Sequence, residues 1–187
     1  MYNEIHYWNK RKYPNSTLYK GEPSIGKEVR YIKKHLCDCR CILDFGPGIG
    51  RTFFLYKHLT HIDCFDITDK HLSALKNEAI RYNFELDFTL GCEVGVTPYT
   101  DKKFDVAIVC QVLLHQRPAN INKIMTEILR VSDKVIVVSG HSKSKSWPRN
   151  KNSHCFNYNY IKLCKENGWS ISDINYDSNH IYFVYSE

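Results

Sequence analysis

Three glycines at alternate positions, Gly46, Gly48 and Gly50, follow directly after a short apolar run. Glycines let a backbone turn sharply and let a ligand approach without meeting a Cβ atom. Residues 52–59 have apolar groups at helical spacing, and the unpaired N–H groups of a helix's first turn attract polar and anionic groups. The pattern therefore predicts a nucleotide-binding loop between a buried strand and a helix.

The spacing of the glycines excludes two common nucleotide-binding loops. A dinucleotide fingerprint would need its third glycine at position 51, which is arginine in this chain. A P-loop would end in Gly-Lys-Ser or Gly-Lys-Thr, and neither triplet follows here. We therefore expect the loop not to bind NAD.

An acid on the next strand points to a ribose. Residues 61–68 predict a second strand that ends in an acid, and Asp66 stands 20 residues after Gly46. An acid at about that separation lies at the tip of the adjacent parallel strand, where it can accept hydrogen bonds from both ribose hydroxyls. The loop and the acid together predict a nucleoside ligand.

These residues resemble the motifs of the class I S-adenosylmethionine-dependent methyltransferases. The G-x-G-x-G loop after Leu43-Asp44-Phe45 is similar to the family's first motif, and Asp66 matches its ribose-binding acid. Phe104-Asp105-Val106, followed by Val-Leu-Leu-His at 112–115, is similar to its fourth-strand pattern. The resemblance covers residues from about 25 to 187 and implies S-adenosylmethionine as cofactor. The cofactor-binding residues that it implies are Asp44, Phe45, Gly46, Pro47, Gly48, Gly50, Asp66, Ile67, Cys92, Glu93, Cys110 and Gln111.

Two further places are candidates for contact with the methyl acceptor. His115 is a candidate general base or substrate contact, because an imidazole suits proton transfer near neutrality; the alternative is that it only hydrogen-bonds its loop. Residues 1–23 form an aromatic-rich arm. In the resembled family such a segment often folds over cofactor and substrate, which makes Tyr7, Trp8 and Tyr19 candidate lid residues. Alternatively, they only hold the terminus against the core.

The polar stretch 140–154 surrounds a tryptophan with basic residues and histidines and contains no acid. It should leave the carboxyl end of the fifth strand, on the same edge as the glycine loop. Its cations favour an anionic acceptor, either phosphorylated or carboxylated. A small molecule is favoured over nucleic acid because one short basic loop offers few phosphate contacts. The alternative is a solvated surface loop. The candidate acceptor residues here are Lys143, Lys145, Trp147 and Arg149.

Missing motifs narrow the class of acceptor. The fourth strand is not followed by Asn/Asp-Pro-Pro-Tyr, so methylation of exocyclic amino groups of bases is not expected. The chain also has no Pro-Cys pair, which removes the usual nucleophile for cytosine C5. The remaining hypotheses are transfer to an O, N, S or C nucleophile of a small molecule, transfer to RNA or protein, and a catalytically silent cofactor-binding subunit.

Strands that alternate with helices are needed to bring these residues together. They predict an α/β fold: a doubly wound, mostly parallel seven-stranded sheet with helices on both faces and a C-terminal antiparallel hairpin. We expect one domain, 1–187, with an arm at 1–23 and a core at 24–187. Ser24 and Asp69 are predicted helix N-caps, and Pro118 suits a first helical turn. The predicted strands cover about 41–45, 61–68, 86–90, 103–110, 135–138, 169–176 and 181–185, and further helices, with their caps, about 24–35, 69–83, 118–129 and 158–167.

The composition indicates a globular chain of 187 residues, 43% hydrophobic and 25% charged. Its apolar runs are too short to span a bilayer and no signal peptide is evident, so we expect a cytoplasmic protein without a membrane partner. The net charge of +6 favours anionic partners. The eight cysteines are expected to be free thiols. No metal is expected at His35, Cys37, Cys39 and Cys41, which lack a second matching pair. Nothing indicates the oligomeric state.

Overall fold

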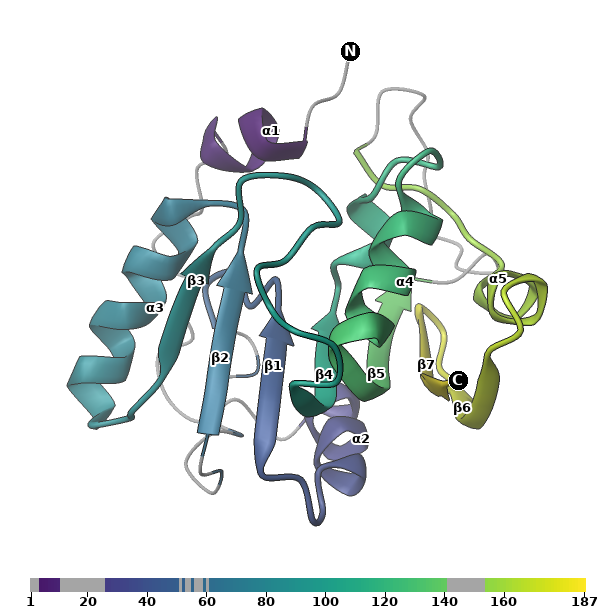
Figure 1. Cartoon of the computed structure of the whole chain (residues 1–187), viewed down its shortest axis with the longest axis horizontal. Helices are drawn as coiled ribbons and strands as arrows, with labels where there is room; N and C mark the ends of the chain where they lie inside the picture. The colour runs from purple at the N-terminus through teal and green to yellow at the C-terminus, as the bar shows by residue number, and fades with distance from the viewer. Residues whose placement is uncertain are drawn as a thin grey trace.

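The computed structural model describes residues 4–10, 26–50, 52, 55, 59, 61–140 and 154–187. Seven strands form one sheet there: β1 (Cys41–Phe45), β2 (His61–Asp66), β3 (Asp87–Leu90), β4 (Phe104–Cys110), β5 (Ser132–Gly140), β6 (Ser170–Tyr176) and β7 (His180–Ser186). Their order is β3-β2-β1-β4-β5-β7-β6 (Figure 1). The first five strands pair in parallel, whereas β7 is antiparallel to β5 and β6. The predicted sheet and its terminal hairpin are confirmed.

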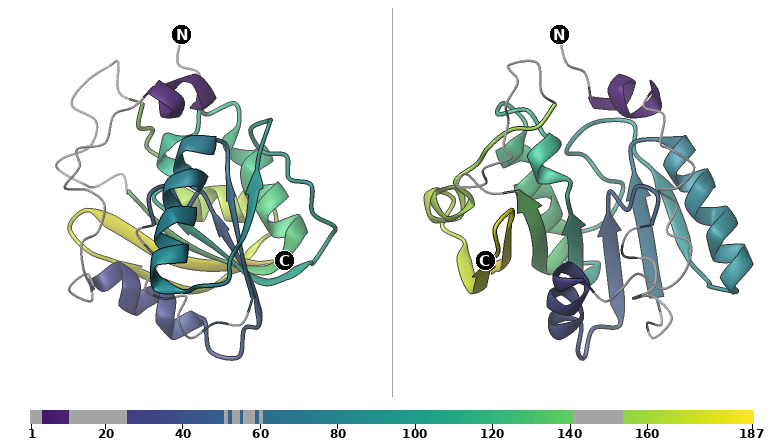
Figure 2. Two further views of the ribbon diagram at one scale, coloured as in Figure 1. Left: turned by 90° about the vertical axis from the view of Figure 1, so that its left-hand side faces the viewer. Right: turned by 180° about the vertical axis from the view of Figure 1, so that it is seen from behind.

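Helices cover both faces of this sheet (Figure 2). α2 and α3 pack on one face and α4 and α5 on the other, because each presents an apolar stripe to the strands. α1 lies apart from these layers, beyond the carboxyl ends of the parallel strands (Figure 1). No helix among the described ranges is long and apolar enough to cross a bilayer. The helices are α1 (Glu4–Lys10), α2 (Lys27–His35), α3 (Asp69–Tyr82), the short 3₁₀ helix η3 (Leu113–His115), α4 (Ile121–Val131) and α5 (Tyr160–Glu166).

The central strands are apolar on both sides, which is why their sequences are nearly continuous hydrophobic runs. In β4, Val106 and Ile108 pack toward α2 and α3, whereas Ala107 and Val109 pack toward α4 and α5. All four side chains are fully buried. The winding of the sheet reverses between β1 and β4, so the carboxyl ends of these two strands flank the place where ligands bind in such sheets.

The residues predicted at three helix N-termini are wrong. Thr68, and not Asp69, is the N-cap of α3, and its side chain does not cap the helix because its Oγ1 donates to Asp66 Oδ1 at 2.9 Å. Pro118 lies in a turn before α4, which begins at Ile121. Ser24 lies outside the described residues, and the N-cap of α2 is Gly26, not the predicted Ser24. Most of the predicted helix 52–59 also lies outside the described residues.

The N-terminal arm also differs from its expectation. The sequence shows no sustained helical period there, yet residues 4–10 form the α1 helix. Its buried residue is Glu4 rather than an aromatic side chain. A tertiary contact of this acid, described below, stabilises a helix that local sequence does not predict.

Candidate functional site

The glycine loop turns with left-handed backbone conformations at each of its glycines. The φ angles are +74° at Gly46, +57° at Gly48 and +85° at Gly50. A Cβ added to Gly46 would lie 2.6 Å from Cγ2 of Val112, so this position also needs glycine for packing. A Cβ added to Gly48 would meet no atom within 4 Å. The backbone at Gly48 is therefore open on the side where a side chain would stand.

Asp66 fastens the glycine loop to the end of β2. Its Oδ2 accepts from the Gly48 N–H at 3.2 Å and lies 3.1 Å from His71 Nδ1. Its Oδ1 accepts from the N–H and Oγ1 of Thr68 at 3.0 and 2.9 Å. The carboxylate is 5% exposed. Asp66 thus stands where the sequence predicts an acid, and a ribose would have to share oxygens that already accept hydrogen bonds.

Asp44 ends β1 beneath the same loop. Its side chain is buried, and its Oδ2 accepts from Thr52 Oγ1 at 2.6 Å. Burial raises the pKa of this carboxyl to about 7; the Thr52 hydrogen bond opposes the rise and the nearby Asp66 charge adds to it. The Asp44 carboxyl therefore changes its protonation near neutral pH.

The free energy of unfolding should consequently depend on pH through Asp44. Between about pH 4 and about pH 7 the folded state binds the extra proton, so stability is lost as the pH rises through this window. Asp44→Asn keeps an acceptor for Thr52 but cannot ionise. The free energy of unfolding of the variant, relative to that of wild type, should rise by about 2–4 kcal/mol when the pH is raised from about 5 to about 8. Denaturant titrations of both proteins at these two pH values measure this difference. Equal pH dependence of the two proteins would show that Asp44 does not titrate between them.

Two predicted cofactor residues, Cys110 and Gln111, lie at the carboxyl end of β4, which pairs with β1 at the switch point. Gln111 has a φ of +59°, uncommon for a residue with a side chain. Its N–H donates to Val138 O at 2.7 Å and its Nε2 to Glu28 Oε1 at 3.4 Å, so it turns the chain and contacts α2. Cys110, just before it, is partly buried.

The other cofactor candidates lie in different surroundings. Phe45 packs in the core against Phe65, with ring centroids 5.1 Å apart, so only its backbone can face a ligand. Ile67 is half-buried against the same core, and Pro47 is buried in the loop. Cys92 and Glu93 are exposed after β3, and Glu93 Oε1 accepts from Lys123 Nζ at 2.6 Å.

α1 brings two predicted lid residues onto the carboxyl edge of the sheet. Trp8 packs edge-on against His115 with ring centroids 4.8 Å apart, and Tyr7 stacks on His154 at 4.4 Å. The helix is fastened by Glu4, which is 2% exposed. Its Oε1 accepts from Arg117 Nε and Asn120 Nδ2, both at 3.1 Å. Tyr19, Lys143, Lys145, Trp147 and Arg149 lie outside the described residues.

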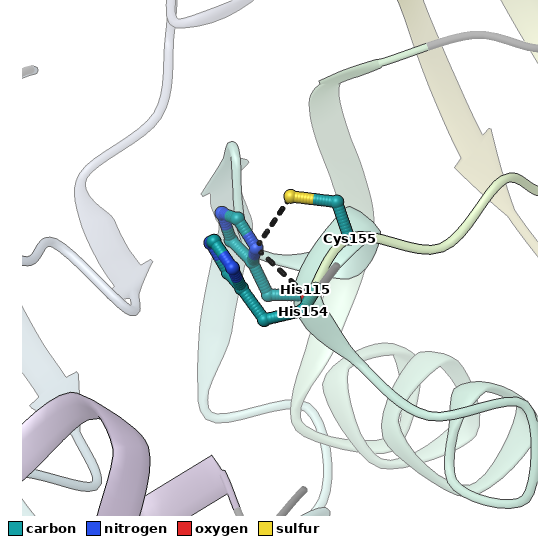
Figure 3. Close-up of side chains that lie close together, drawn as sticks. All are labelled: His115, His154 and Cys155. Carbon is teal, nitrogen blue, oxygen red and sulfur yellow. Dashed lines mark hydrogen bonds between the residues drawn. The ribbon is translucent and has the colours of Figure 1, made fainter. Parts of the chain in front are cut away.

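His115 contacts the segment that precedes α5. Its Nδ1 lies 3.3 Å from the carbonyl oxygen of His154 and 3.4 Å from Cys155 Sγ (Figure 3). This contact is what the hydrogen-bonding alternative for His115 expects. No motif in the sequence assigns a role to Glu4, His71 or Cys155. The sequence shows only an acid within an aromatic arm and a histidine five residues after Asp66.

Known proteins share this architecture. The sequence model of the family described as "Methyltransferase domain" matches residues 42–134, from β1 into β5. No curated protein sequence matches the chain. Among solved structures, the PH0226 protein of Pyrococcus horikoshii has 15% identity and a TM-score of 0.74, over 87% of this chain and 88% of that one.

Two other solved structures have the same fold. An S-adenosylmethionine-dependent methyltransferase from Clostridium acetobutylicum has 11% identity and a TM-score of 0.71, over 86% of this chain and 91% of that one. Magnesium protoporphyrin IX methyltransferase from Synechocystis, solved with bound S-adenosylmethionine, has 14% identity and a TM-score of 0.63, over 86% and 76%.

The fold and the family match define a methyltransferase domain. The chain belongs to the class I S-adenosylmethionine-dependent methyltransferases, and it is an enzyme whose cofactor is S-adenosylmethionine. The described residues fit this cofactor, because the backbone at Gly48 is open to a ligand and a carboxylate ends the neighbouring strand.

Proposed function

We propose that this enzyme moves the methyl group of S-adenosylmethionine to an O, N, S or C nucleophile of an anionic small molecule. The observation that carries the proposal is the cover that α1 forms over the carboxyl edge of the sheet, where Trp8 and Tyr7 lie on His115 and His154. An edge closed by a helix suits a small acceptor better than a long nucleic acid or a folded protein. The basic stretch 140–154 supports an anionic one. A cytoplasmic location and a single-domain organisation belong to the same proposal.

The residues of this chain would act mainly by holding and aligning the two reactants. Bound S-adenosylmethionine supplies a methyl group that is already activated by its positive sulfur. Asp66 would accept hydrogen bonds from the ribose hydroxyls, and the open backbone at Gly48 would let the cofactor approach the loop. The remaining cofactor residues implied by the family resemblance belong to this proposal too. α1 would exclude water, and alignment with desolvation can provide much of the acceleration.

A general base is needed only when the nucleophile must lose a proton. His115 is the candidate for this role from the sequence. Its Nδ1 is within reach of His154 O and Cys155 Sγ, so a base acting through this nitrogen would first have to release those atoms. This geometry favours a role for His115 together with its two neighbours over a role as an isolated base.

The acceptor class can be tested through the basic stretch. Replacing Lys143, Lys145 and Arg149 together with alanine should raise the acceptor KM at least about tenfold and leave cofactor affinity unchanged, because each removed cation pairs with the acceptor's negative groups. The acceptor itself is found by incubating cell extracts with methyl-labelled S-adenosylmethionine and separating metabolites, RNA and protein.

A matched control removes the same charge elsewhere. Lys70, Lys76 and Arg81 are exposed residues of α3, and their triple alanine variant should keep the acceptor KM. Equal KM values for all three proteins would refute an anionic acceptor bound at 140–154. Label in RNA or protein would favour the macromolecular alternative, and cofactor binding without any transfer would favour a silent subunit.

A further inference from the structure

Three side chains with metal-binding atoms lie together at the carboxyl edge of the sheet. His115, His154 and Cys155 each offer one ligand atom, and these atoms lie within 4.8 Å of one another. All three residues are partly buried. Figure 3 shows the two imidazoles side by side with the thiol directed toward Nδ1 of His115. Among the described residues, no other group of three or more histidines, cysteines and acids is close enough together to hold an ion.

The backbone fixes the positions of these residues from two separate parts of the chain. His115 ends η3, which begins three residues after the end of β4, whereas His154 and Cys155 precede α5. The Phe156 N–H donates to Leu114 O at 2.6 Å, so the residues next to His115 and Cys155 are joined by a main-chain hydrogen bond. The Tyr158 hydroxyl donates to Gln116 O and adds a second bond between the same segments. The cluster therefore follows from the backbone pairing of these two segments.

The donor set selects the type of ion. Two imidazoles and a thiolate suit a borderline ion such as Zn²⁺ and are unsuited to Mg²⁺ or Ca²⁺, which prefer oxygen. With Zn–S of about 2.3 Å and Zn–N of about 2.0–2.1 Å, a tetrahedral site places sulfur and nitrogen about 3.6 Å apart. Cys155 Sγ and His115 Nδ1 are 3.4 Å apart. The separation of these two atoms is therefore already close to the one that two zinc ligands require.

The second histidine must reorient to complete the set of ligands. The rings of His115 and His154 are within 12° of parallel, with centroids 4.9 Å apart, so their in-plane lone pairs do not converge on one point. Binding one ion through all three residues therefore requires the His154 ring to turn out of its stacking between Tyr7 and His115. Zinc has no geometric preference from its d electrons, so it can adopt the coordination that the side chains then offer.

We infer that His115, His154 and Cys155 bind one Zn²⁺ ion and leave its fourth coordination position open. On binding, a Zn–S bond forms, the Cys155 thiol gives its proton to solvent, and no atom is oxidised or reduced. Three protein ligands and one exchangeable position are the arrangement of catalytic rather than structural zinc sites. The fourth position takes water or a heteroatom of the methyl acceptor; the second of these rests on the proposed function, whereas zinc binding itself does not.

Metal analysis of the full chain tests the site without any acceptor. Protein equilibrated with excess ZnCl₂ and then dialysed should retain one zinc per chain. Cys155→Ser and His154→Ala should each weaken zinc affinity by more than about 100-fold, because loss of a direct ligand exceeds the cost of losing an outer-shell partner. Cys37→Ser, which removes an exposed cysteine before β1, should retain full zinc binding.

Cobalt provides a second measurement that identifies the ligand. With Co²⁺ in place of zinc, the wild type and Cys37→Ser should show a thiolate-to-metal charge-transfer band, and Cys155→Ser should lack it. Circular dichroism and S-adenosylhomocysteine binding establish that each variant is folded. Zinc binding that persists in Cys155→Ser, is lost in Cys37→Ser, or never exceeds trace levels in wild type overturns the site. Zinc binding with no methyl transfer to any acceptor overturns only the use of the fourth position and the proposed function.

Discussion

Gly48→Ala is expected to weaken S-adenosylmethionine binding by about 10- to 100-fold while lowering stability by only about 1–2 kcal/mol. The stability cost comes from the φ of +57°, which an alanine adopts with strain. A Cβ at this position meets no protein atom within 4 Å, so it adds no clash in the protein alone. It would stand where the cofactor approaches the loop. Calorimetric titration with S-adenosylhomocysteine and a thermal melt measure the two effects separately.

Gly168→Ala provides a matched control for this variant. Gly168 has a φ of +74° after α5, and a Cβ there also meets nothing within 4 Å. Both variants should therefore lose similar stability, whereas only Gly48→Ala should lose cofactor affinity. Equal affinity in the two folded variants would mean that the cofactor does not approach the backbone at Gly48.

Asp66→Ala is expected to weaken cofactor binding at least about tenfold, because hydrogen bonds to a charged acceptor contribute about 1.5–3 kcal/mol each. The variant should also be less stable, since the Gly48 and Thr68 N–H groups lose their acceptor. Asp66→Asn keeps one acceptor oxygen and separates these effects. Titration calorimetry with S-adenosylhomocysteine gives the affinity of each variant, and denaturant titration gives its stability.

Asp63→Ala is the control for Asp66. Asp63 lies on the same strand, is 3% exposed, and accepts from Tyr99 OH at 2.7 Å and Thr89 Oγ1 at 3.0 Å. Its loss should destabilise the fold without changing cofactor affinity. An unchanged dissociation constant in folded Asp66→Asn and Asp66→Ala would remove Asp66 from the ribose site. Asp63 is not expected to replace it, because Asp63 lies three residues before the carboxyl end of β2 and its carboxylate is bound to Tyr99 and Thr89 within the fold.

The sheet was predictable from the sequence because its determinants are local. The runs that form β4 and β5 are apolar on both faces, and such runs are typical of buried parallel strands. Asp66 could be placed at the tip of β2 because the length of a βα unit fixes its distance from the glycine loop. These features need only the order of residues along one segment.

Contacts between distant segments were not predictable in the same way. α1 is fastened through Glu4 to Arg117 and Asn120, more than 110 residues later. The Cys155–His115 contact likewise spans 40 positions. The N-cap of α3 was misplaced by one residue because Thr68 and Asp69 are both residue types favoured at this position. The Thr68 hydroxyl donates to Asp66 instead of capping the helix, a contact that the local sequence does not reveal.

The burial of Glu4 also bears on how quickly the enzyme can complete a cycle. To leave the edge of the sheet, α1 must separate an ion pair whose carboxylate is almost wholly removed from water, and must expose Trp8 and Tyr7 at the same time. Leaving either charge of such a pair without its partner is costly. If products depart beneath α1, the rate of their release is set by the separation of Glu4 from Arg117 and not by methyl transfer. The turnover rate then measures how fast α1 opens.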